Sequence, residues 1–156
     1  MPSSAMMMSS LQEEHALMTT LLDLLRQEQR LLLAADTEQL TTLTAHKAQL
    51  VAQLGNCATQ RHAVLAASGF AQAEQGMDGW LARADPAPAA PLWSALLALT
   101  REAKEQNRIN GMLVNKQLAH TQGALNTLRP TTQGGGFYGP SGQTTAGAAS
   151  RRFVVG

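Results

Sequence analysis

The stretch that decides the fold of this chain is residues 92–128, LWSALLALTREAKEQNRINGMLVNKQLAHTQGALNTL. Apolar or small residues recur three and four positions apart along the whole stretch, which is the spacing of one face of a helix. The members of this stripe are Leu92, Leu96, Leu99, Ala103, Asn107, Asn110, Val114, Leu118, Thr121, Leu125 and Leu128. The pattern predicts one long helix over residues 91–128.

The middle of this helix departs from a simple leucine repeat. Asn107 and Asn110 place amides where aliphatic side chains are usual, and a buried amide needs a hydrogen-bond partner, so we expect these residues to set register. Ile109 and Met112 fall on the opposite side and form a second apolar face. Gly111 lies between the faces and costs about 1 kcal/mol relative to alanine, so we expect the close approach of another backbone to offset it. The second face fits either packing within the chain's own bundle or a groove for a partner's helix or extended segment.

Two further long helices are predicted earlier in the chain, over residues 10–34 and 37–67. Ser10 to Glu13 matches the capping box of a helix start. Asp36 is a good cap for the second helix, and Gly69 follows its end. One unbroken rod over residues 10–66 remains an alternative, although we favour a break near Asp36.

The remaining segments are expected to be connectors and ends. Residues 1–9 are predicted to be a frayed leader. Residues 69–90 are rich in glycine and proline, which rules out a long helix there, but a short helix near residues 77–84 would place Trp80 on the end of the bundle. Residues 131–156 are predicted to be a flexible tail.

These elements predict an all-α fold. The chain has 156 residues, of which 44% are hydrophobic and only 4% aromatic, so its apolar content is mostly leucine and alanine, which favour helices over strands. The expected architecture is an antiparallel bundle of three long helices with coiled-coil-like packing and a short connector helix over residues 1–130, followed by the tail, residues 131–156.

Charge and composition exclude several classes of function. The formal net charge is +1, from twelve basic and eleven acidic residues distributed along the helices, so a nucleic-acid partner is not expected. The one cysteine fits a reducing compartment. The first ten residues lack the features of a signal peptide, and no stretch approaches the roughly 20 apolar residues of a membrane span. We therefore expect a cytoplasmic protein without stable membrane insertion.

No catalytic, cofactor-binding or metal-binding set stands out. The histidines are scattered and have no metal-binding spacing: His15, His46, His62 and His120. Cys57 occupies an apolar repeat position, as a small buried hydrophobe does. The glycines 134–136 lack the strand, helix and lysine of a phosphate loop. The sequence thus predicts a protein that is not an enzyme and has no cofactor.

Three motifs in the last third of the chain resemble the flagellar type III export chaperones of the FlgN family. They are the helix segment Arg108-Ile109-Asn110-Gly111-Met112-Leu113, the helix end Ala124-Leu125-Asn126-Thr127-Leu128-Arg129-Pro130 and the tail element Tyr138-Gly139-Pro140-Ser141-Gly142-Gln143. Asp36, Leu40, Lys47 and Arg61 are similar to the family's first half. The glycine-rich linker before Tyr138 and the proline-rich connector before the last helix depart from the family pattern.

The resemblance implies a cytoplasmic chaperone that binds hook-filament junction proteins, prevents their premature assembly and delivers them to the flagellar export gate. By that analogy a terminal helix of the client binds at Ile109, Asn110, Gly111, Met112 and Leu113. The tail residues Tyr138, Gly139, Pro140 and Gly142 are implied to dock on the cytoplasmic domain of the export-gate membrane protein.

Two other functions are alternatives to a chaperone. The chain fits a structural or adaptor coiled coil, a homodimer in which the second apolar face serves self-association; a homodimer in the absence of client is also compatible with the chaperone. A small helical enzyme or metal-binding bundle needs Glu-x-x-His ligand pairs on facing helices, and Glu14-His15 is adjacent rather than spaced.

Overall fold

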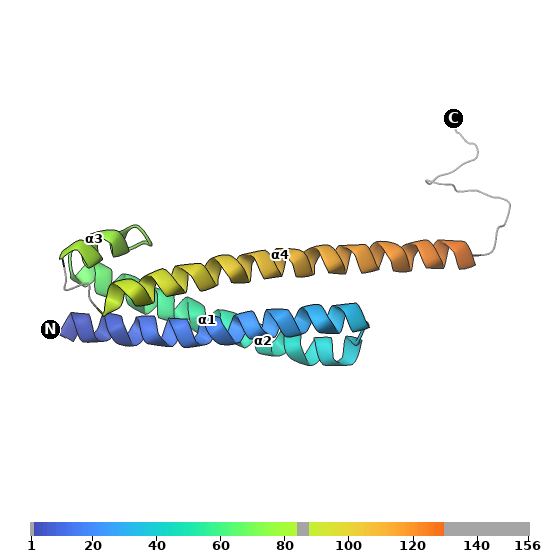
Figure 1. Cartoon of the computed structure of the whole chain (residues 1–156), viewed down its shortest axis with the longest axis horizontal. Coiled ribbons are helices and arrows are strands. Elements are labelled where there is room, and N and C mark those ends of the chain that lie inside the picture. The colour runs from blue at the N-terminus through green and yellow to red at the C-terminus, as the bar shows by residue number, and fades with distance from the viewer. Residues whose placement is uncertain (1, 84–87, 130–156) are drawn as a thin grey trace, which may run out of the picture. The chain divides into compact units, whose positions relative to one another are not determined.

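Four α-helices make up the part of the chain that the structure describes. The computed structural model describes residues 2–83 and 88–129, in the order α1 (Pro2–Ala34), α2 (Thr37–Ala67), α3 (Gly76–Arg83) and α4 (Ala89–Leu128) (Figure 1). No strand occurs in these two ranges. The all-α class is confirmed, whereas the tail predicted for residues 131–156 lies outside the described residues.

The chain divides into two compact units, Met1–Asn115 and Lys116–Gly156. The first unit contains α1, α2, α3 and α4 as far as Asn115. The described part of the second unit is the rest of α4 with Arg129.

A two-residue turn joins α1 to α2, and Asp36 serves both helices. The amides of Ala35 and Asp36 donate to the carbonyls of Leu32 and Leu31, which closes α1 in a Schellman motif with Ala35 in the left-handed region at φ 55°. The carboxylate of Asp36 accepts from the amide of Gln39 at 3.1 Å and so caps α2. The chain therefore breaks at Asp36, and α2 returns along α1 as an antiparallel neighbour (Figure 1).

The start of α1 differs from the sequence prediction. The helix begins at Pro2 rather than at residue 10, so residues 1–9 are not a frayed leader within the described range. Met7 and Leu11 are fully buried, in the same cluster as Trp93. Ser10 is an interior helix residue, and its hydroxyl donates to the carbonyl of Cys57 at 3.2 Å instead of capping a helix. Tertiary burial of the two apolar side chains outweighs the local capping signal.

Two apolar clusters hold the first unit together. The cluster near the start of α1 joins four helices through Met7, Leu11, Val64, Leu65, Met77, Trp80, Ala89, Trp93 and Leu96. The second lies further along α1 and consists of Leu21, Leu22, Leu25, Leu50 and Ala103. The connector helix α3 contributes Met77 and Trp80 to the first cluster. The sequence predicts that Trp80 packs on the end of the bundle, and it is buried in this cluster.

Polar contacts show that α4 runs in the same direction as α1 within this unit. Arg26 pairs with Glu102 at 3.1 Å, and Gln106 donates to Gln29 at 3.1 Å. The apolar clusters give the same direction, because Leu11 and Trp93 lie in the first cluster and Leu22 and Ala103 lie in the second. Since α2 is antiparallel to α1, the three long helices alternate in direction.

Candidate functional site

Asn110 fixes α4 against α1. It is only 2% exposed, and its amide nitrogen donates to the carbonyl of Leu25 and to Glu28 Oε1, both at 2.8 Å. Gln106 donates to its amide oxygen at 3.0 Å. The buried amide of Asn110 thus has three hydrogen-bond partners. A shift of α4 by one turn would leave this amide unsatisfied, so Asn110 sets the register of α4 against α1.

Glu28 connects all three long helices. Its Oε2 atom accepts from Lys47 of α2 at 2.8 Å, while its Oε1 atom accepts from Asn110 of α4. The side chains of Glu28 and Lys47 are mostly buried, so this pair is screened little by water. The lysine that interrupts the apolar stripe of α2 therefore acts as a register contact.

The residues around Gly111 differ in how far they are exposed to solvent. Gly111 is exposed, and a Cβ atom added to it would meet nothing within 4 Å. The close backbone approach expected there does not occur among the described residues. Met112 is 58% exposed, whereas Ile109 and Leu113 are half-buried. Of the five predicted client-binding residues, only Asn110 lies in the bundle core.

The apolar stripe of α4 is buried only as far as Asn110. Leu96 and Ala103 lie in the core, but large hydrophobic side chains between 47% and 80% exposed occur at every later turn but one. They are Met112, Val114, Leu118, Leu125 and Leu128. Residues 118–129 are all exposed. The leucine repeat therefore continues in sequence beyond Asn110, the last buried residue of α4.

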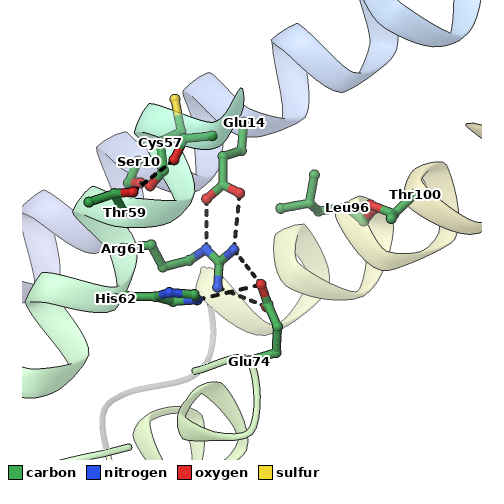
Figure 2. A network of polar contacts seen from close by, with 10 residues as sticks. Ser10, Glu14, Cys57, Thr59, Arg61, His62, Glu74, Leu96 and Thr100 are labelled. Atoms are coloured by element: carbon green, nitrogen blue, oxygen red, sulfur yellow. Dashed lines mark hydrogen bonds and ion pairs between the residues drawn. The ribbon is translucent and has the colours of Figure 1, made fainter. Parts of the chain in front are cut away.

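A buried ion cluster lies at the other end of the first unit (Figure 2). Arg61 is 2% exposed; its Nε and Nη2 atoms donate to Glu14 at 2.7 and 3.2 Å, and Nη1 and Nη2 donate to Glu74 at 2.9 and 3.0 Å. The guanidinium also lies 4.8 Å from the ring centroid of Trp93. Every face of this cation is thus occupied, which is the condition under which a buried charge is tolerated.

Although burial opposes both shifts, the contacts within the cluster raise the pKa of Arg61 and lower that of Glu74. Partial burial acts to raise the pKa of Glu74, but the hydrogen bonds and charge of Arg61 and a smaller effect of His62 outweigh it, so the pKa is lowered from its ordinary 4.5. His62 Nε2 lies 3.5 Å from Glu74 Oε1, at the limit of a hydrogen bond. Arg61, Glu14 and Glu74 satisfy one another, so they hold α1, α2 and the segment before α3 together, whereas His62 Nε2 is buried without a hydrogen-bond partner among the described residues.

Sequence reasoning missed this cluster, although one signal was present. Arg61 occupies a position of the α2 apolar repeat, where a charge has to find a partner in the core. Its partner Glu14 is 47 residues away in sequence, and no local pattern identifies it.

The other candidate reactive residues are structural or isolated. Cys57 is buried, and burial, followed by the charges of Glu13 and Glu14, raises the pKa of its thiol. In residues 2–83 and 88–129 no group of three or more His, Cys, Asp and Glu side chains is arranged to hold a metal ion. None of the helices described is long and apolar enough to cross a membrane. The predicted docking residues Tyr138, Gly139, Pro140 and Gly142 lie outside the described residues.

The fold and this site define a class: a protein that is all-helical over the described residues and whose last helix carries exposed apolar residues at helical spacing. The family model described as FlgN protein matches residues 1–146. The chain belongs to the FlgN family of flagellar export chaperones. Searches of curated proteins and of solved structures found no match.

Proposed function

We propose that this protein is a cytoplasmic chaperone that binds hook-filament junction proteins, prevents their premature assembly and delivers them to the flagellar type III export gate. Family membership supports a flagellar export chaperone in general. The observation that carries the proposal is the row of exposed large hydrophobic side chains on α4 from Met112 to Leu128. A helix that leaves such residues uncovered is suited to receive an amphipathic helix of a partner.

The proposed client-binding residues are Ile109, Gly111, Met112 and Leu113, with Asn110 acting indirectly. The bonds of Asn110 to α1 set the rotation of α4 and therefore the direction in which its neighbours point. Met112 is the most accessible of the apolar members. Arg108 lies one turn earlier, pairs with Glu105 at 2.6 Å and contacts the Met112 sulfur, which holds this turn in one arrangement.

Substitutions of this turn test the client site. We expect Met112→Asp and Ile109→Asp to weaken binding of a purified junction protein at least ten-fold, because a carboxylate would be desolvated in the complex. The melting temperature should change little for Met112→Asp. Leu33→Asp is the matched control, since Leu33 is also a strongly exposed apolar residue, at the end of α1. Equal loss of binding in the control, or unfolding by Met112→Asp, would argue against this site.

Docking at the export gate is proposed for Tyr138, with Gly139, Pro140 and Gly142. An aromatic side chain supplies a large contact area, and few of its side-chain torsions lose freedom on binding. Tyr138 is therefore suited to contact a second partner while the client is held. Tyr138→Ala should leave client binding intact and impair export. Loss of client binding in a purified pair would show that the two tasks are not separate.

A structural or adaptor homodimer is the second candidate. Leu118, Thr121, Leu125 and Leu128 alternate at spacings of three and four, as in a coiled-coil seam. A dimer that dissociates when client is added is compatible with a chaperone, whereas a dimer of fixed stoichiometry that excludes the client supports the structural function.

A further inference from the structure

A long groove lies between α2 and α4 in the first unit, with α1 as its floor. Two adjoining hollows of about 440 and about 410 Å³ form it, and both are lined by Met18, Thr100 and Lys104. Along α4 the lining runs from Trp93 to Asn107, which is about 21 Å at 1.5 Å per residue. The groove therefore has the length of a helix of about four turns.

The α2 wall of the groove permits the close approach of a helix. The lining residues of α2 include Val51, Leu54, Gly55 and Ala58. A Cβ atom added to Gly55 would meet nothing within 4 Å, so this wall has open space at its centre. Val51 lines the larger hollow and is 55% exposed. Apolar surface flanked by small residues is the surface on which another helix packs closely.

The α4 side of the groove has a basic rim: Lys104 is the one charged α4 residue that lines the hollows, and Arg101 and Arg108 flank it outside them. Lys104 lines both hollows and forms no ion pair in the described part of the chain. Arg101 and Arg108 lie three residues before and four residues after it, so the three cations project from the same side of α4. Arg101 is also exposed without an ion pair among the described residues, and Arg108 pairs only with the exposed Glu105.

The charge distribution of the chain argues against its own last segment as the occupant. All eleven acidic residues precede residue 106, and the segment 106–156 contains five basic residues: Arg108, Lys116, Arg129, Arg151 and Arg152. Neither the end of α4 nor the tail, from this copy or a second one, offers a carboxylate to Lys104. A partner that matches the groove has to bring acidic residues of its own.

We propose that the groove between α2 and α4 binds an amphipathic helix of a partner protein, with an apolar stripe over Met18, Val51 and Leu54 and with carboxylates facing Arg101, Lys104 and Arg108. The occupant completes a four-helix arrangement with α1, α2 and α4. Its carboxylates are spaced three and four residues apart, matching the spacing of the three cations. This surface borders the proposed client site, because Arg108 contacts Met112, but none of the proposed client-binding residues lines the groove.

The test uses the full chain and a stapled helical peptide of about four turns, because short unconstrained peptides are poorly helical in water. The peptide carries a leucine stripe and three glutamates at the stated spacing. A second peptide has lysines in place of the glutamates. Binding is measured by fluorescence anisotropy at low and high salt. We expect the glutamate peptide to bind at least ten-fold more tightly than the lysine peptide, and this preference to decrease with salt.

Two pairs of variants locate the binding. Gly55→Leu fills the groove and should weaken binding of the glutamate peptide at least ten-fold. Ala45→Leu, on an exposed part of α2, should leave this binding unchanged. Lys104→Glu should remove the preference for glutamate. Arg30→Glu is its control, because Arg30 is likewise exposed and forms no ion pair in the described ranges.

Three results would overturn the proposal. The first is absence of binding by either peptide, and the second is equal binding of the two. The third is a dimer of the free chain that Gly55→Leu dissociates, as seen by light scattering, because the groove would then hold a second copy.

Discussion

At the residue scale, the buried Arg61 has two carboxylate partners in unequal surroundings. The side chain of Glu14 is almost fully buried, whereas that of Glu74 is 57% exposed. The same type of ion pair is therefore screened by solvent on one side of the guanidinium and not on the other. The contribution of each carboxylate to stability should differ accordingly.

We predict that Glu14→Gln lowers the free energy of unfolding by about 3 kcal/mol, because it leaves a buried cation without its buried counter-charge. Glu74→Gln should cost less than about 1 kcal/mol. Urea unfolding followed by circular dichroism measures both. Equal losses in the two variants would show that burial does not decide the strength of these pairs.

The lowered pKa of Glu74 makes part of the stability depend on pH. Above its ordinary pKa of 4.5 this carboxylate is charged in the folded and unfolded chain, so its interaction with Arg61 is complete. As the pH falls below 4.5 the unfolded chain binds the proton first, which favours unfolding.

We therefore predict that wild type exceeds Glu74→Gln in stability near neutral pH and that this difference shrinks below pH 4.5. Arg61 stays protonated throughout. Urea unfolding of both proteins across the acid range measures the difference. A difference that is independent of pH would contradict the assignment of this pKa shift to the folded state.

Residue patterns predicted some of these contacts and not others. Asn107 and Asn110 are both predicted to set register because amides interrupt the apolar stripe; Asn110 is bonded to α1, whereas Asn107 is exposed. The partners of Arg61 were not predictable, since a pairing over 47 residues depends on how the helices come together.

At the scale of elements, the ends of α1 and α2 show the same geometry with different residues. Phe70 donates to Leu65 and Gly69 donates to Ala66, so α2 ends in a Schellman motif with Gly69 at φ 85°. The matching position after α1 is Ala35, at φ 55°. A Cβ atom is unfavourable in this region, and glycine is free of that penalty.

We predict that Ala35→Gly raises the free energy of unfolding by about 1 kcal/mol, because relief of the left-handed strain exceeds the entropy that glycine adds to the unfolded chain. Ala34→Gly, one residue earlier and still helical, is the control and should destabilise. Thermal melting measures both. A lower melting temperature for Ala35→Gly would contradict the strain at this turn.

The sequence predicts the three long helices largely correctly, but it predicts their ends less well. Capping by Asp36 and the glycine after α2 are local signals, and the structure has both. The start of α1 was misplaced by eight residues because Met7 and Leu11 are buried by residues distant in sequence. The α4 stripe is buried as far as Asn110 and exposed at most positions after it, a difference that periodicity alone does not indicate.

At the scale of the whole molecule, two surfaces are proposed to bind partners. The groove between α2 and α4 carries Lys104 on its α4 side, whereas the exposed apolar residues from Met112 to Leu128 follow one helix. A chaperone that holds a client and then releases it to an export gate needs affinity of moderate strength, and a single exposed helix supplies a contact of limited area.

The proposed function requires this chain to bind a hook-filament junction protein. Light scattering on a sizing column, with the full chain alone and mixed with a junction protein that retains its terminal helices, tests it most directly. We predict a complex of defined mass that Met112→Asp weakens and Leu33→Asp does not. Absence of any complex, together with a stable dimer of the free chain, would contradict the chaperone function and support a structural coiled coil.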